Sequence, residues 1–211
     1  MSTATLPAPM PSGLPAGTGR PGTDRLPRAS SVDLIVVGGV PGAGKTTAIA
    51  AATEGLPHVL VLDPEHVHHA IRAQVPGWMP YRAYRAIVHT VHTLAVVAYL
   101  LRGPRTGIPL IVHDPGTRRR RRRLFLRIAD RRGWRSVAVY VDVDRAAART
   151  GQLDRGRALR AGTFGRHWDR WEQVRTQLDQ PSDRIGADHG TDVLVIRSQA
   201  AAVIRRLCRG S

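Results

Sequence analysis

The segment Gly39-Val40-Pro41-Gly42-Ala43-Gly44-Lys45-Thr46 matches the phosphate-binding loop pattern G-x-x-x-x-G-K-[ST] in full. The chain contains 32 Lys and Arg residues together, and Lys45 is the only lysine among them. A compact ammonium on a flexible stem can reach between the β- and γ-phosphates, a task that suits a planar guanidinium poorly. The segment therefore predicts a site for a nucleoside triphosphate.

The sequence on either side of this loop has the expected pattern. Residues 32–37 are apolar except for Asp33 and predict a buried parallel strand, and residues 46–52 predict the first turns of a helix. Glycines let the backbone fold around phosphates, and the helix N-terminus adds the positive end of its dipole. The hydroxyl of Thr46 is the expected ligand for Mg²⁺. The expected nucleotide contacts are Gly39, Val40, Pro41, Gly42, Ala43, Gly44, Lys45, Thr46 and Thr47.

Apolar runs alternate with helical patterns along the rest of the chain, which is typical of an α/β fold with a parallel sheet. The length of 211 residues suits one such domain, which we expect to span residues 31–211. Residues 1–30 are rich in Pro, Gly, Ala, Ser and Thr and predict a disordered tail. The expected strands are residues 32–37, 58–62, 110–113, 137–141 and 193–196. The expected helices are residues 81–101, 118–128, 145–160, 169–178 and 200–207.

The composition limits the setting and the partners of the protein. A single cysteine, Cys208, excludes a disulfide within the chain and favours a reducing, cytoplasmic compartment. No apolar run approaches the roughly 20 residues that span a bilayer, so we expect no membrane partner. The net charge of +16 suggests a polyanionic partner such as nucleic acid, with the six arginines from Arg118 to Arg123 as the contact. A solvated basic surface or a compositional bias towards arginine is the alternative.

Acidic residues directly follow the expected strands. Asp63, Asp114 and Asp142 each follow an apolar run, and the carboxyl ends of parallel strands form the ligand crevice of open α/β sheets. Asp114 ends the run 110–114 in the Walker B arrangement, so we expect it to bind Mg²⁺ together with Thr46. For Asp142 or the nearby Asp144, capping of the following helix is an equally good interpretation.

Three anchors make the chain resemble P-loop kinases, the AAA-type ATP-binding group that contains polynucleotide kinase, zeta toxins, chloramphenicol phosphotransferase and gluconate kinase. They are the G-x-P-G-x-G-K-[ST]-T loop, an acid just after the second strand, and the arginine-rich segment 149–157. The resemblance covers about residues 32–205. It implies a P-loop NTPase fold, a three-layer α/β/α sandwich whose five-stranded parallel sheet has the order 2-3-1-4-5, with a short arginine-rich lid.

The same resemblance implies roles for single residues. In those kinases the carboxylate after strand two accepts the proton of the attacking hydroxyl, and a substrate-binding arginine follows three residues later. These positions fall on Glu65 and His68, so the arginine is missing here. Asp63 is the other candidate base, or else the cap of a helix that begins at Pro64. Arg155 and Arg157 match the lid, where one arginine would close on the γ-phosphate, although a solvated helix end has the same composition.

Histidines form the groups His66/His68/His69 and His89/His92, with His113 beside Asp114. Spacing of three could place pairs on one helix face, but no cysteine or neighbouring carboxylate pattern completes a zinc site, so none is predicted. We expect these histidines to line an acceptor pocket or to form local hydrogen bonds.

Together these features predict an ATP-dependent phosphotransferase that uses Mg²⁺ and acts on a hydroxyl of a small molecule, a nucleotide or a nucleic acid end. The alternative is a non-kinase ATP- or GTP-binding regulatory module that binds nucleic acid through its arginine face. The sequence indicates neither the acceptor nor the oligomeric state.

Overall fold

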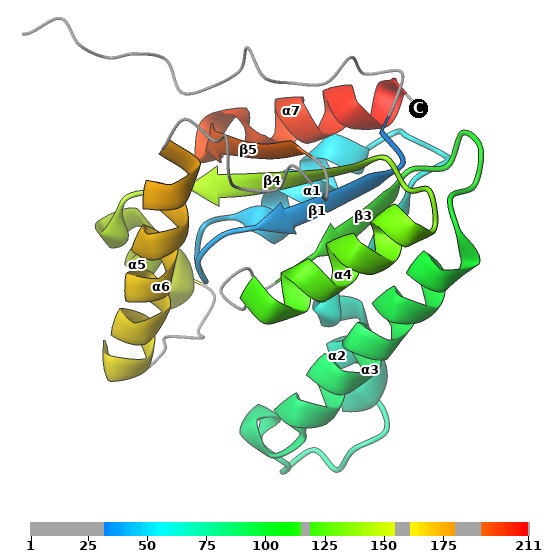
Figure 1. Ribbon diagram of the computed structural model, residues 1–211. Coiled ribbons are helices and arrows are strands. Elements are labelled where there is room, and N and C mark those ends of the chain that lie inside the picture. The colour runs from blue at the N-terminus through cyan, green and yellow to red at the C-terminus, as the bar shows by residue number, and fades with distance from the viewer. Residues whose placement is uncertain (1–31, 115–118, 155–160, 180–190, 211) are drawn as a thin grey trace, which may run out of the picture.

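The computed structural model describes residues 32–114, 119–154, 161–179 and 191–210. Its centre is one five-stranded sheet in which every pair of neighbours is parallel, with the order β2-β3-β1-β4-β5 (Figure 1). This is the predicted order, so the predicted fold class is confirmed. The strands are β1 Leu34–Gly38, β2 Leu60–Leu62, β3 Leu110–His113, β4 Ser136–Asp142 and β5 Thr191–Ile196.

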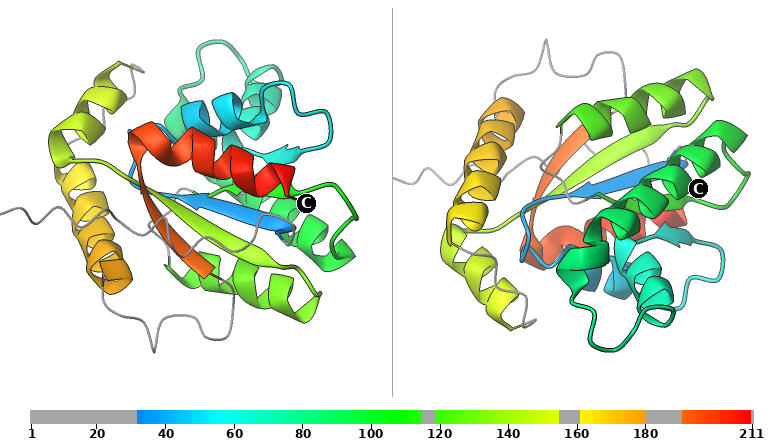
Figure 2. Two further views of the ribbon diagram at one scale, coloured as in Figure 1. Left: turned by 90° about the horizontal axis from the view of Figure 1, so that it is seen from above. Right: turned by 90° about the horizontal axis from the view of Figure 1, so that it is seen from below.

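Helices cover both faces of the sheet and complete the three layers. Helices α1 and α7 lie together on one face, and α3 and α4 lie on the other, with α2 packed against α3 (Figure 2). Helices α5 and α6 stand beside the carboxyl end of β4 (Figure 1). The helices are α1 Lys45–Thr53, α2 Pro64–Arg72, α3 Tyr81–Arg102, α4 Arg119–Arg131, α5 Arg145–Leu153, α6 Ala161–Asp179 and α7 Arg197–Arg209.

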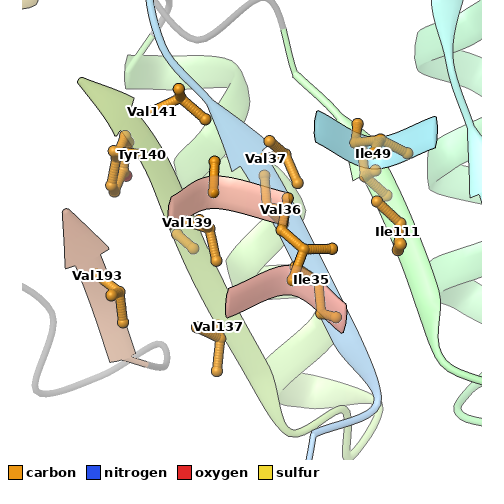
Figure 3. Packing of buried hydrophobic residues seen from close by; sticks show 14 of the residues in the cluster. Ile35, Val36, Val37, Ile49, Ile111, Val137, Val139, Tyr140, Val141 and Val193 are labelled. Carbon is orange, nitrogen blue, oxygen red and sulfur yellow. The ribbon is translucent and has the colours of Figure 1, made fainter. Parts of the chain in front are cut away.

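The two central strands account for much of the core. All five residues of β1 are buried, and β4 is buried up to its last residue. Figure 3 shows Ile35 and Val37 of β1 beside Val139 of β4, with Ile49 of α1 also in the cluster. Full burial of one such side chain contributes about 1.5–3 kcal/mol. The sheet and α1 therefore hold the start of the phosphate-binding segment on a rigid base.

Several boundaries differ from the sequence-based expectations. Helix α2 was expected only as the alternative in which Asp63 caps a helix from Pro64, and that helix is present. Helix α6 begins at Ala161, well before the predicted residue 169, whereas α5 ends at Leu153. The expected tail, residues 1–30, lies outside the described residues.

The tryptophans are not all in the core. Trp168 and Trp171 are buried there. Trp78 is 80% exposed and lies in the connection between α2 and α3.

Helix α3 is the one described helix that is long and apolar enough to cross a membrane by length and composition. One side of it packs on the domain and buries Tyr84, Val88, His92, Val96 and Leu100. His92 is 1% exposed and its Nε2 lies 3.2 Å from the carbonyl oxygen of Leu62. Burial lowers the pKa of His92, because a charged imidazole would lose its hydration there.

Candidate functional site

The phosphate-binding segment leaves β1 and turns sharply into α1. Gly42 and Gly44 have φ angles of 88° and 86°, in the region that side chains other than glycine rarely adopt. A Cβ on Gly42 would lie 2.0 Å from the carbonyl oxygen of Ala148 in α5, so the loop also needs glycine there for space. Gly44 is the N-cap of α1 and brings the start of the helix to the loop.

Lys45 points back over the loop from the first residue of α1. It is only 6% exposed, and its Nζ donates to the carbonyl oxygens of Gly39 at 3.0 Å and Val40 at 2.8 Å. These contacts hold the ammonium within the curve of the loop. This position suits an ammonium group that binds phosphate oxygens, because the lysine can exchange its carbonyl partners for phosphate with little movement.

Asp114 lies beside the loop because β3 is the neighbour of β1. Val37 is paired with His113, and the next N–H, that of Asp114, donates to the carbonyl oxygen of Val37 at 3.0 Å. The Asp114 side chain is fully buried, and its Oδ1 accepts a hydrogen bond from Arg121 of α4. Its Oδ2 has no hydrogen-bond partner among the described residues. A buried carboxylate oxygen without a partner suits a cation, so Asp114 fits the predicted Mg²⁺ site.

Asp63 follows β2, the next strand along the sheet, and both of its oxygens are occupied. Oδ1 accepts the backbone N–H of Glu65 at 2.8 Å, which caps α2, and Oδ2 lies 2.8 Å from Nδ1 of His113. Burial alone would raise the pKa of Asp63, but the bond to His113, its charge and the Glu65 N–H outweigh burial, and the pKa is lowered. Asp63 is therefore a weaker and less available base than the sequence suggested.

Glu65 lies in the first turn of α2, three residues beyond the end of β2. Its Oε1 is 3.5 Å from Nδ1 of His68 and 3.6 Å from Nε2 of His69. Nε2 of His68 is 3.0 Å from the hydroxyl of Tyr84 in α3. The ring of Tyr81, also in α3, meets the His68 ring edge-on, with centroids 4.7 Å apart. Two histidines of α2 thus lie beside this carboxylate, and tyrosines of α3 hold one of them, His68.

Two side chains that were not predicted from the sequence bind carbonyl oxygens of the loop from α5 and α7. Arg197, the first residue of α7, donates through Nε to the carbonyl oxygen of Ala43 at 3.1 Å and through a terminal nitrogen to that of Gly42. Gln152 of α5 donates to the carbonyl oxygen of Pro41 at 3.1 Å. The position of Arg197 directly after β5, at the carboxyl edge of the sheet, was a signal that could have found it.

A cavity of about 440 Å³ adjoins the loop between α1, α5 and α7. Gly44 and Thr47 form its loop side, Asp154 belongs to the α5 side, and Arg197 and Ala201 belong to α7. The volume is within the range of about 300–1,000 Å³ for small-molecule pockets. A ligand could thus extend from the loop towards α7.

The arginine run is divided between the interior and the surface. Arg121 binds Asp114, and Arg122, which is buried, places its guanidinium 4.9 Å from the ring centroid of Tyr140. Arg120 and Arg123 are exposed. Arg118 and the side chain of Arg119 lie outside the described residues, as do Arg155 and Arg157 of the expected lid. Only part of the run is therefore available for nucleic acid.

The other predicted acids have structural partners. Asp144 is the N-cap of α5 and accepts the N–H of Ala147 at 2.7 Å, as its alternative interpretation expected. Asp142 faces α6, where it accepts from Trp171 at 3.3 Å and lies 3.4 Å from Nε of Arg175. Of the predicted acids, Asp114 is thus the one that lies at the carboxyl ends of β1 and β3. Asp63 and Glu65 follow the neighbouring strand β2.

Residues 34–181 match the family model AAA_33, described as an AAA domain. The chain belongs to this family. Membership confirms the resemblance to P-loop kinases that the loop, the following acid and the arginine-rich segment predicted. No curated protein sequence is significantly similar to this AAA_33 chain.

Solved structures with the same fold include kinases. A protein of the PezAT chromosomal toxin–antitoxin system of Streptococcus pneumoniae is similar at 15% identity and a TM-score of 0.55, over 80% of this chain and 68% of that chain. Shikimate kinase of Acinetobacter baumannii, solved with shikimate, is similar at 18% identity and a TM-score of 0.50, over 85% of this chain and 90% of that chain. At such identities the likeness establishes the fold.

Proposed function

We propose that this AAA_33 domain is an ATP-dependent phosphotransferase that moves the γ-phosphate of ATP to a hydroxyl group of a small molecule, a nucleotide or a nucleic acid end. The observation that carries the proposal is the order of the strands β2, β3 and β1. It puts the Asp63–Glu65 segment, Asp114 and the phosphate-binding loop at consecutive carboxyl ends of one sheet. A protein that only binds a nucleotide does not need the first of these acidic segments.

On the nucleotide side, the loop residues 39–47 would hold the phosphates, and Lys45 would neutralise charge on the β- and γ-phosphates. The cavity beside Arg197 has room for the base and ribose. Thr46 and Asp114 would hold Mg²⁺, which would offset the negative charge that develops on the phosphate oxygens. The unpartnered Oδ2 of Asp114 supports this assignment.

On the acceptor side, Glu65 would take the proton. The hydroxyl oxygen of the acceptor bonds to the γ-phosphorus, the bond from that phosphorus to the β–γ bridging oxygen breaks, and ADP leaves. The hydroxyl proton passes to the Glu65 carboxylate. Asp63 is the less suitable base because a backbone N–H and His113 occupy its two oxygens. Asp63 would instead fix the start of α2 and so the position of Glu65.

Arg155 and Arg157 would complete the site as the lid, where we propose that Arg155 stabilises the transferring group and Arg157 contacts the nucleotide. A guanidinium in this role can contribute roughly 10³- to 10⁵-fold in rate. The support for this assignment is their position after α5, which packs against the loop through Gln152.

The experiment is a screen for transfer from ATP labelled at the γ-phosphate, with hydroxyl-bearing metabolites, nucleosides and 5′-hydroxyl oligonucleotides as acceptors. We expect a labelled product with one acceptor class, and no product with Lys45→Ala protein. If ATP binds but no acceptor is labelled, the phosphotransferase proposal is wrong.

That result would favour the second candidate, a nucleotide-binding regulatory module with an arginine face for nucleic acid. Two observations favour this candidate: His68 stands where the related kinases have a substrate-binding arginine, and Arg121 already binds Asp114. The exposed Arg120 and Arg123 would then be contacts for nucleic acid.

A further inference from the structure

The first turns of α2 bring together three side chains that could ligate a metal ion. Glu65, His68 and His69 are spaced at i, i+3 and i+4, so their side chains share one side of the helix. One ligand atom from each lies within 4.8 Å of the other two. The carboxylate oxygen is central, at 3.5 Å from Nδ1 of His68 and 3.6 Å from Nε2 of His69.

His68 is held as a metal-binding histidine usually is. One ring nitrogen, Nε2, is 3.0 Å from the hydroxyl of Tyr84, which is itself only 2% exposed. The other nitrogen, Nδ1, points towards Glu65, is buried and has no hydrogen-bond partner among the described residues. Histidine ligands commonly use one nitrogen for an outer partner, which orients the ring and leaves the lone pair of the other for the ion.

We propose that Glu65, His68 and His69 form a binding site for Zn²⁺ or a similar borderline transition metal. Zinc bonds of about 2.0–2.1 Å in tetrahedral geometry place neighbouring ligand atoms about 3.4 Å apart, close to the two separations here. Two imidazoles with one carboxylate favour zinc over magnesium, which takes oxygen ligands. Three protein ligands leave one position for water or a further ligand.

The site also explains why the unpartnered nitrogen faces a carboxylate. In the tautomer whose proton lies on Nε2, facing Tyr84, the lone pair of His68 Nδ1 faces the Glu65 carboxylate, and a cation between them would bind both. In the other neutral tautomer the Tyr84 hydroxyl donates to Nε2 and Nδ1–H faces Glu65 without metal, so a binding measurement must separate the two arrangements. The spacing of the histidines alone did not predict the site, because Glu65 was not recognised as the carboxylate that completes it.

The consequence for catalysis rests on the proposed function, whereas the metal site does not. Glu65 is the proposed base, and a carboxylate that ligates zinc has a lone pair that is no longer available for a proton. Zinc bound at α2 would therefore inhibit phosphoryl transfer while Mg²⁺ at Thr46 and Asp114 supports it. One acid would thus link transfer to the local concentration of zinc.

The test is a titration of the full-length protein with Co²⁺, a spectroscopic substitute for zinc, followed by displacement with Zn²⁺. Excess Mg²⁺ is present to occupy oxygen-rich sites, and no nucleotide is added. We expect one equivalent of Co²⁺ to produce the visible absorption of a low-coordinate complex with nitrogen ligands, and Zn²⁺ to abolish that absorption.

Two matched variants identify the ligands. His69→Ala removes an exposed ligand, so the fold is unaffected, and affinity should fall by more than the roughly 10- to 100-fold typical of losing an outer partner. His66→Ala removes an exposed histidine of the same helix that is not in the cluster, and affinity should stay unchanged. No visible band, or equal losses in the two variants, would overturn the proposal.

An activity measurement tests the consequence separately. Zn²⁺ should inhibit phosphoryl transfer by the wild-type protein and by His66→Ala, and should inhibit His69→Ala only at concentrations higher by the same factor as its loss of affinity. Co²⁺ binding without any transfer activity would support the metal site and contradict the proposed function. Transfer activity without Co²⁺ binding would support the proposed function and contradict the metal site.

Discussion

The two sides of the candidate site are built in different ways. On the nucleotide side, positive-φ glycines, carbonyl oxygens and the start of α1 make the loop, and Lys45, Arg197 and Gln152 hold it by donating to its carbonyl oxygens. On the α2–α3 side, Glu65, His68 and Tyr84 make the site through their side chains, on helices whose backbone is regular. A backbone site demands particular residues at each position, whereas a side-chain site can exchange residues and so change its ligand.

This comparison predicts that substitutions on the nucleotide side abolish function altogether. Lys45→Ala should reduce transfer by at least roughly 10³-fold, because a preorganised charge that faces the transferring phosphate is lost. ATP affinity, measured by calorimetry, should fall as well. Unchanged ATP affinity in a folded Lys45→Ala protein would mean that nucleotide binds elsewhere.

On the α2–α3 side, a substitution should impair transfer and spare ATP binding. Glu65→Gln should lower kcat by about 10²- to 10³-fold, within the range for loss of a general base. Asp63→Asn is the matched change, and it should have a smaller effect on kcat because Asp63 is already held by His113 and the Glu65 N–H. Single-turnover transfer with the best acceptor measures both. A larger loss in Asp63→Asn would reassign the base.

The requirement for glycine in the loop can be measured as a loss in the free energy of unfolding when a glycine is replaced. Gly42→Ala adds a Cβ 2.0 Å from the Ala148 carbonyl oxygen, whereas Gly55→Ala, at a similar φ of 70°, meets nothing within 4 Å. Strain at positive φ costs each variant about 1–2 kcal/mol. Gly42→Ala should lose more than Gly55→Ala, in urea unfolding at neutral pH, because of the added clash. Equal losses would mean that α5 moves away from the loop at little cost.

The smallest expected effect concerns an ion pair at the amino-terminal end of β1, at the opposite end of the strand from the loop. Asp33, before β1, accepts Nε and a terminal nitrogen of Arg135, each at 2.7 Å, and this hydrogen bonding lowers its pKa below the ordinary 3.8. A carboxyl group whose pKa is lower in the folded state than in the unfolded state stabilises the fold at pH values above its unfolded-state pKa. This stabilisation is lost as the pH falls through its folded-state pKa.

Arg135→Ala should therefore unfold at a slightly lower temperature than wild type near pH 7, and the difference should shrink below about pH 4. Thermal unfolding followed by circular dichroism across this range measures it, with Arg132→Ala, an exposed arginine of the same region, as control. A difference independent of pH would show that Arg135 acts through packing.

The same comparison explains what the sequence could predict. The strands, the loop and the place of Asp114 after β3 were predictable, because each depends on a contiguous pattern such as glycine spacing or an apolar run that ends in an acid. The strand order was expected only from the resemblance to P-loop kinases. The contacts of Asp63 with His113, and of Arg197 with the loop, join residues 50 and about 155 positions apart. No local pattern encodes such pairs, since the sheet order brings them together.

The arginine run 118–123 is a second feature whose contacts could not be predicted from the sequence. Six identical neighbours carry no periodicity, so the sequence could not indicate which of them turn inwards. The position of α4 over β4 decides it: Arg121 contacts Asp114, and Arg122 lies over Tyr140. Two arginines that looked like surface charge are thus part of the interior.

The contact between Arg197 and the loop has a consequence for biosynthesis. Residues 42 and 43 leave the ribosome early, yet the guanidinium that holds their carbonyl oxygens belongs to a helix translated more than 150 residues later. Helix α7 also packs along α1, so this support of the helix that follows the loop forms late as well. A nascent chain that ends before residue 197 should therefore hold its nucleotide poorly, and competence to bind should be gained only as α7 emerges and docks.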